Sequence, residues 1–231
     1  MKQKEAENCH KGHREHVRHR FVTSGLEAFA PHEILELLLF YSIPQRDTNP
    51  LAHKLMETYG SLFGVLSAPV EDLMTIDGVG ERTAVLLSLI FQVGRWIRLE
   101  QMNGAGVNFL CQESAQQYCK ELFCGQHNEA AYELCLNQRG NLLTCNCMAN
   151  GNIRSVSMDI RTLIKNAVLS HADSILLTHN HPGGDAMPSP EDRDATRHIE
   201  DALDRVNIRL RDHIVVGENE IVSMREMGYL K

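Results

Sequence analysis

The sequence predicts an α/β (α+β) chain with an all-helical N-terminal part and a C-terminal mixed β-sheet part flanked by helices. Three observations support this. Residues 21–99 carry helical patterns alone, residues 101–106 are rich in small and polar residues, and strand patterns alternate with helical ones after that break. We therefore expect a tail over 1–20, a helical domain over 21–100, a linker at 101–106 and a mixed domain over 108–231.

The helical part is divided by clear start and stop signals. Pro31 precedes one apolar run, Asn49-Pro50 opens another, and Gly60 ends it. A short helix begins near Glu71, and a long one follows Gly78-Val79-Gly80. The expected helices cover 33–41, 49–59, a short segment near 67–73, and 81–99.

The mixed part alternates between strand and helix patterns. Residues 138–140 form a turn between two apolar runs, which predicts a hairpin. The expected strands cover 130–137, 141–148, 174–178, 208–216 and 221–222. The expected helices cover 112–123, 159–170 and 190–206.

Composition is that of an ordinary soluble globular protein. The 231 residues are 43% apolar and 23% charged, with a net charge of −7 from 23 basic and 30 acidic residues. No apolar run approaches the roughly 20 residues that span a bilayer, and residues 1–20 are too polar for a secretory signal. We therefore expect a cytoplasmic protein.

Seven cysteines are present, and none forms a C-x-x-C pair. Several lie in apolar stretches, which favours buried free thiols over a disulfide framework or a zinc finger. They are Cys9, Cys111, Cys119, Cys124, Cys135, Cys145 and Cys147.

The N-terminal tail is the one basic segment. Residues 1–20 hold six Lys or Arg against three Glu, and histidine recurs at every third position from His10 to His19. We interpret the tail as a solvated, partly disordered arm. A weak metal-binding or nucleic-acid-contacting arm stays open as the alternative.

A candidate metal site lies where the third expected strand ends. His179 and His181 are two residues apart, so in an extended chain their side chains point to the same side. Ser189-Pro190 is a helix start that places Asp192 in the first turn, where it can face back toward the histidines. Two His and one Asp leave a fourth zinc position for water, as catalytic rather than structural sites do.

Local chemistry alone leaves this open, since an H-x-H pair and a Ser-Pro-Glu-Asp helix start are both common. The spacing H-x-H-x7-S-x2-D, however, matches the core motif of the JAB/MPN (JAMM) metallo-isopeptidases. The surrounding residues 178–182, Pro188 and Asp212-His213 resemble the bacterial RadC-like branch of that family. The resemblance covers nearly the whole chain except the tail, and it implies one zinc ion on His179, His181 and Asp192.

The resemblance also implies an upstream glutamate as general acid/base and Ser189 as donor to the oxyanion of a tetrahedral intermediate. By position the glutamate is Glu129, although Ala131 stands where the family usually has a large residue. Glu133, which we expect to be a solvated strand residue, and Glu121 remain alternatives. Gly183-Gly184 replaces the usual Ser-Gly, so we expect a slightly looser loop there.

The implied activity is zinc-dependent hydrolysis of an amide or isopeptide bond in an unidentified peptide or protein. Iron also accepts two His and one carboxylate, but would not explain Ser189. Residues 145–154 are the expected selectivity loop, and nothing in the sequence indicates an oligomeric state.

The alternative function is a DNA-associated repair accessory or scaffold protein with a non-catalytic metal site. Gly78-Val79-Gly80 resembles a helix-hairpin-helix hairpin, whose backbone amides can approach a phosphate. The charge around it argues against DNA, because four acidic residues face one arginine, Arg82. The four are Glu71, Asp72, Asp77 and Glu81.

Overall fold

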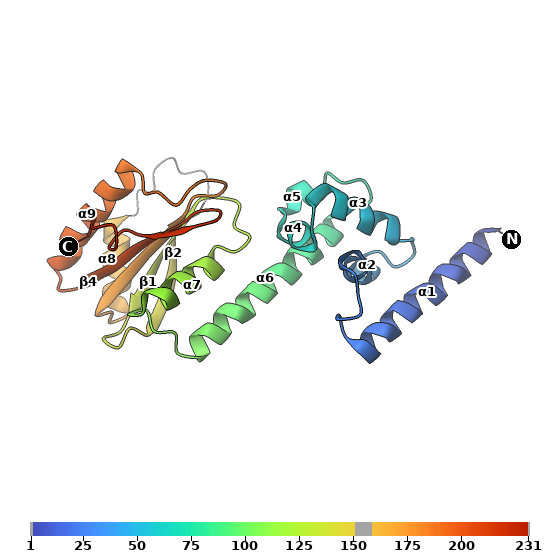
Figure 1. Ribbon diagram of the computed structural model, residues 1–231, viewed down its shortest axis with the longest axis horizontal. Coiled ribbons are helices and arrows are strands. Elements are labelled where there is room, and N and C mark those ends of the chain that lie inside the picture. Colours follow the sequence, from blue (N-terminus) through green and yellow to red (C-terminus); the bar gives the residue numbers. More distant parts are fainter. Residues whose placement is uncertain (1, 151–158, 231) are drawn as a thin grey trace. The chain divides into compact units, whose positions relative to one another are not determined.

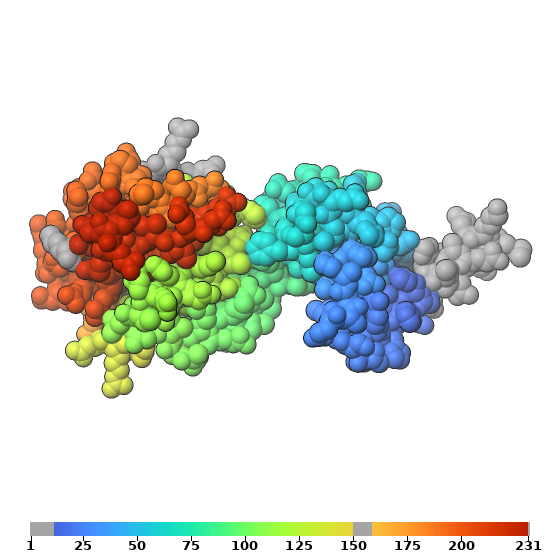
Figure 2. All heavy atoms as spheres, viewed as in Figure 1, coloured from blue at the N-terminus to red at the C-terminus, as the bar shows by residue number. Residues whose placement is uncertain are grey.

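The computed structural model describes the backbone of residues 2–150 and 159–230 and the side chains of residues 12–149 and 159–230 (Figures 1 and 2). The chain divides into two compact units, Met1–Gly94 and Arg95–Lys231, which are considered separately. The described helices of the first unit are α1 (Lys2–Ser24), α2 (Pro31–Ser42), α3 (Asn49–Tyr59), α4 (Leu62–Ser67) and α5 (Val70–Leu73). Helix α6 (Glu81–Gly104) begins there and ends in the second unit.

The first unit is all-helical, as expected. Helices α2 to α6 share a core that contains Leu35, Leu55, Val65, Leu73 and Leu87, each fully buried. Among α2 to α6, α4 is the helix that the sequence patterns do not predict. The prediction of a linker at 101–106 is wrong for most of its length, because helix α6 continues to Gly104.

The prediction of a partly disordered N-terminal tail is also wrong, because residues 2–24 form helix α1. Val17 is buried against Leu37 and Phe40 of α2. The buried Arg14 guanidinium lies over the Phe40 ring and donates to the carbonyls of Ile43 at 2.7 Å, Pro44 at 3.0 Å and Arg46. Arg14 therefore satisfies carbonyls that the C-terminus of α2 and its following turn would leave exposed.

The second unit is a five-stranded mixed sheet with helices on both faces (Figure 1). The strand order is β2-β1-β3-β4-β5, in which β3 and β4 are parallel and the other pairs antiparallel. The strands are β1 (Ala130–Leu136), β2 (Leu142–Asn150), β3 (Ser174–Asn180), β4 (Arg209–Val216) and β5 (Ile221–Ser223). This architecture confirms the predicted α/β class.

Helices cover the two faces differently. Helix α7 (Gln112–Leu122) packs on one face with Leu134, Leu176 and Ile214. Helices α8 (Ile160–Leu169) and α9 (Pro190–Asp204) pack on the other face, which carries Leu177 and Val215. In the part of the chain that the structure describes, no helix has the length and apolarity to cross a bilayer.

One extra residue in β4 changes which face its side chains occupy. Ile175 of β3 pairs with Leu210, whereas Leu176 pairs with Asp212, so Arg211 is the extra residue of a β-bulge. The bulge shifts the alternation by one position. As a result, Leu210 and His213, three residues apart, both lie on the α8/α9 face.

Replacing Arg14 by Ala should destabilise the α1–α2 contact by about 1.5–3 kcal/mol, because charge-assisted hydrogen bonds to several carbonyls are lost. Hydrogen exchange of the full chain, followed by mass spectrometry, should show faster exchange in α1 and the C-terminal turn of α2. Arg18→Ala is the matched control, because Arg18 is an exposed arginine on the same helix. Equal protection in both variants would contradict this role for Arg14.

Candidate metal centre

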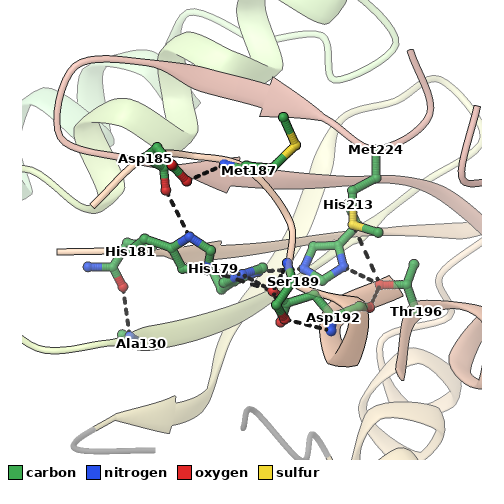
Figure 3. Close-up of polar contacts among 11 residues, drawn as sticks. Ala130, His179, His181, Asp185, Met187, Ser189, Asp192, Thr196, His213 and Met224 are labelled. Atoms are coloured by element: carbon green, nitrogen blue, oxygen red, sulfur yellow. Dashed lines mark hydrogen bonds and ion pairs between the residues drawn. The ribbon is translucent and has the colours of Figure 1, made fainter. Parts of the chain in front are cut away.

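The two histidines lie at the end of β3, the central strand between β1 and β4. His179 is 2% exposed and faces α9, while His181 follows the strand and donates its backbone N–H to Val216 O at 2.8 Å. Their Nε2 atoms are 3.1 Å apart (Figure 3). The extended backbone therefore brings the two imidazoles together, as expected from their spacing.

Asp192 reaches the histidines from the first turn of α9. Ser189 caps this helix: its Oγ accepts the Asp192 N–H at 3.0 Å, and Asp192 Oδ2 accepts the Ser189 N–H at 2.9 Å. Asp192 Oδ2 lies 3.6 Å from His179 Nε2 and 3.7 Å from His181 Nε2. The capping box thus fixes the carboxylate beside both rings.

The tautomer of His181 follows from its neighbour. His181 Nδ1 is 2.9 Å from Asp185 O, and a carbonyl can only accept, so Nδ1 carries the proton. In the neutral ring Nε2 then presents a lone pair toward His179 and Asp192.

A chain of buried hydrogen bonds sets the tautomer of His179 in the same way. Thr196 Oγ1 donates its only proton to Asp192 O at 2.6 Å, so His213 Nδ1, also 2.6 Å away, must donate to Thr196. His213 Nε2 then accepts from His179 Nδ1 at 2.8 Å. His179 Nε2 is left as a lone pair aimed at the same point as His181 Nε2 (Figure 3).

The three converging atoms are therefore all acceptors, which is the arrangement of a cation site. Zinc bonds of about 2.0–2.1 Å at tetrahedral angles hold ligand atoms roughly 3.3–3.4 Å apart, close to the separations found here. Within the described ranges, one group of His, Cys, Asp or Glu side chains places its potential ligand atoms within 4.8 Å of one another. It consists of His179, His181 and Asp192. The residues present fit a divalent ion with an open coordination position.

Electrostatics support the same conclusion. Burial raises the pKa of Asp192, but hydrogen bonds that His179 and His181 donate when their rings are protonated outweigh burial and hold this pKa well below its usual range. A positive charge beside the Asp192 carboxylate is therefore favoured. The Asp192 carboxylate raises the pKa of His181 in turn. Burial, reinforced by His179, lowers the pKa of His213 and keeps it neutral, as the hydrogen-bond chain requires.

Glu129 lies just before β1, the strand that pairs with the His179 end of β3. The amide of Asn180 holds its flanking backbone, accepting from Ala130 N at 2.7 Å and donating to Asn128 O at 3.1 Å. The β1–β3 ladder pairs Ala131 with His179, and Glu129 immediately precedes β1 at this end of the ladder. Its charge is among the lesser causes that raise the His181 pKa.

The two alternative glutamates are held elsewhere. Glu133 is fully buried, which corrects the expectation of a solvated residue, and its Oε2 accepts from Asn166 at 2.9 Å and Asn146 at 3.3 Å. Glu121 lies on α7 in an ion pair of 2.8 Å with Arg98.

The loop after His181 contains Gly183-Gly184 and has defined contacts of its own. Gly183 takes a left-handed φ of 68°, and Gly184 N donates to His181 O at 3.1 Å. A Cβ on Gly217 would lie 2.7 Å from Ala186 N, so this loop packs closely on the end of β4. Of the expected selectivity loop, residues 145–150 belong to β2, and 151–154 lie outside the described residues.

Comparison with known proteins agrees with this geometry. Residues 109–229 match the RadC-like JAB domain. The chain belongs to the RadC-like JAB family. A UPF0758 protein of Ruegeria pomeroyi is 34% identical over 219 residues, covering 94% of this chain and 97% of its own length. UPF0758 proteins of Rhodobacter capsulatus (31%, covering 93% and 100%) and Fusobacterium nucleatum (29%, covering 97% and 100%) are similar along nearly their whole lengths.

Sequence reasoning missed three residues that support this RadC-like site: Thr196, His213 and Asn180. His213 belongs to the motif that resembles the family, but the sequence assigns it no function. Its pairing with β3 places it beside His179, whose tautomer it sets. Thr196 is four residues after Asp192, which places it on the same face of α9. That spacing was a usable signal.

Thr196→Val should lower zinc affinity by roughly 10- to 100-fold, because His213 loses the acceptor that sets the His179 tautomer. Competition with a chromophoric chelator measures this affinity. Thr196→Ser, which keeps the hydroxyl, should remain near the wild-type value. Wild-type affinity in the Val variant would show that the relay does not orient His179.

Glu133→Gln should stabilise the protein at pH 8. Burial raises the Glu133 pKa despite hydrogen bonds from Asn166 and Asn146, so the folded state binds the proton more tightly than the unfolded chain. Stability is then lost as pH rises above the usual glutamate pKa, and the Gln variant avoids that loss.

Urea midpoints of both proteins at pH 5 and pH 8 check this. The advantage of the Gln variant should grow with pH, whereas Glu121→Gln, which removes an exposed ion pair, should not show that trend. A constant difference at both pH values would contradict the assignment.

Proposed function

We propose that the chain is a zinc-dependent hydrolase of amide or isopeptide bonds, acting on a peptide or protein. The observation that carries the proposal is the convergence of three acceptor atoms, from His179, His181 and Asp192, at a partly open position. His181 and Asp192 retain 24% and 13% side-chain exposure, so water and a substrate carbonyl can reach the site.

When bound, a zinc ion would supply Lewis-acid activation of water and of the substrate carbonyl. Glu129 takes the proton of the attacking water and delivers it to the leaving amine. Two observations support this role: the Asn180 amide, next to His179 and His181, holds the backbone on both sides of Glu129, and the charge of Glu129 contributes to raising the His181 pKa.

Ser189 donates its hydroxyl to the oxyanion of the tetrahedral intermediate in this mechanism. In the structure that proton points to Asp192 Oδ2 at 2.6 Å, while the Ser189 oxygen accepts the Asp192 N–H. The hydroxyl must therefore rotate from the carboxylate to the substrate, while the cap is kept by the oxygen. Such a donor is typically worth about 3–4 kcal/mol to the transition state.

The DNA-associated alternative has one supporting observation. Arg46 and Arg82 line a pocket of about 440 Å³ together with Gly78, Gly80 and the start of α6. Glu81 lines the same pocket and reduces its attraction for phosphates. The metal and cleavage assays below separate this alternative from the hydrolase.

Glu129→Gln should bind metal normally and lose 10²- to 10⁴-fold in cleavage, since it removes the general base. His179→Ala and Asp192→Ala should lose the metal itself. Elemental analysis of protein purified without added metal gives its identity and stoichiometry, expected to be one zinc per chain. Cleavage is followed as new N-termini in a proteome-derived peptide library.

Iron in place of zinc would contradict the metal assignment. Unchanged metal content in both ligand variants would contradict the site. A bound metal with identical peptide profiles for wild type and Glu129→Gln would instead favour a non-catalytic centre.

A further inference from the structure

A second polar pocket lies in the mixed-sheet unit, away from the metal centre. It has a volume of about 260 Å³ and includes Phe109 and Leu176, so it opens on the α7 face of the sheet. His179 points to the opposite face. Leu176 also precedes His179 by three strand positions, roughly 10 Å along β3. The two sites are therefore separate.

Three arginines line this pocket: Arg209, Arg211 and Arg225. Asp212 is the one carboxylate among its lining residues, and its oxygens already accept several hydrogen bonds. They accept from Ser223 Oγ at 2.5 Å, from Gln112 Nε2 at 3.2 Å, and from the backbone N–H groups of His213 and Arg225 at 2.7 and 3.1 Å. The lining thus has a formal charge of +2.

Two of these guanidiniums are positioned by neutral acceptors. Arg225 donates to the carbonyls of Arg211 and of Leu210, the latter at 2.7 Å, and Arg211 Nε donates to Ser174 Oγ at 3.3 Å. These bonds orient the two side chains at the pocket. Burial and the repulsion of Arg209 and Arg225 lower the Arg211 pKa, as expected where like charges are crowded.

The β4 bulge builds this arrangement. In a regular strand Arg211 and Asp212 would point to opposite faces, but the extra residue at Arg211 lets both line the same pocket. Crowding three arginines beside a sheet costs free energy in the absence of an anion. The same bulge also places His213 beside His179, so the clustering of the arginines, rather than the bulge itself, points to an anionic ligand.

We propose that this pocket binds a phosphate-type oxyanion. Guanidinium forks match tetrahedral oxyanions, and a formal charge of +2 matches a divalent anion better than a carboxylate. The volume is several times the roughly 30 Å³ of a water molecule, so it also admits a small apolar group against Phe109 and Leu176. Both inorganic phosphate and a small phosphate monoester share this chemistry.

The test is a titration of the ¹⁵N-labelled, zinc-loaded full chain at constant ionic strength, followed by NMR. Inorganic phosphate and phenyl phosphate are the probes, and acetate is the monovalent control. Amide shifts should concentrate at Gln112, Ser174 and Ser223 rather than at His181, and acetate should bind at least tenfold more weakly. Tighter binding of phenyl phosphate supports a phosphorylated ligand, and equal binding supports the free ion.

Arg211→Gln should weaken phosphate at least tenfold with zinc content unchanged, whereas the matched control Arg161→Gln, an exposed arginine on α8, should not. If Arg211→Gln does not give a folded spectrum, Arg209→Gln at the exposed start of β4 replaces it. Shifts centred on His181, or equal affinity in the pocket variant and its control, would overturn the proposal.

Discussion

The site of this RadC-like protein depends on three lone pairs that face one another. Nitrogen and oxygen acceptors 3.1–3.7 Å apart repel unless a cation or a proton lies between them. Each is fixed from behind: His181 by Asp185 O, His179 by His213, and Asp192 by the helix cap of Ser189. The protein therefore maintains an unfavourable geometry through hydrogen bonds outside the centre, which is how preorganised metal sites are held.

The sheet provides the framework for both sites. Strand β3 is paired on both sides, so His179 cannot move without disrupting two ladders. Strand β4 gives His213 to the α8/α9 face and Arg211 with Asp212 to the other face. One inserted residue in β4 thus supports the candidate metal centre and shapes the arginine pocket at the same time.

Much of this could be predicted from the sequence, because strand ends and helix starts are local signals. Ser189-Pro190 marked the start of α9, and the two-residue spacing marked the shared side of His179 and His181. Other features depend on contacts distant in sequence. The packing of α1 rests on Arg14 meeting carbonyls near residue 44, the burial of Glu133 on Asn166, and the role of His213 on a bulge that no local pattern announces.

Asn180 has a consequence for how the site can be controlled. Its side chain ties the entry of β1 to the exit of β3, so the residues on both strands behave as one stiff unit. Backbone within a paired sheet is the part of a protein least able to fluctuate. Among the described residues next to the centre, the connection from Pro182 to Pro188 lies outside this ladder. How long the centre stays accessible would then depend on how readily the hydrogen bond from Gly184 N to His181 O breaks.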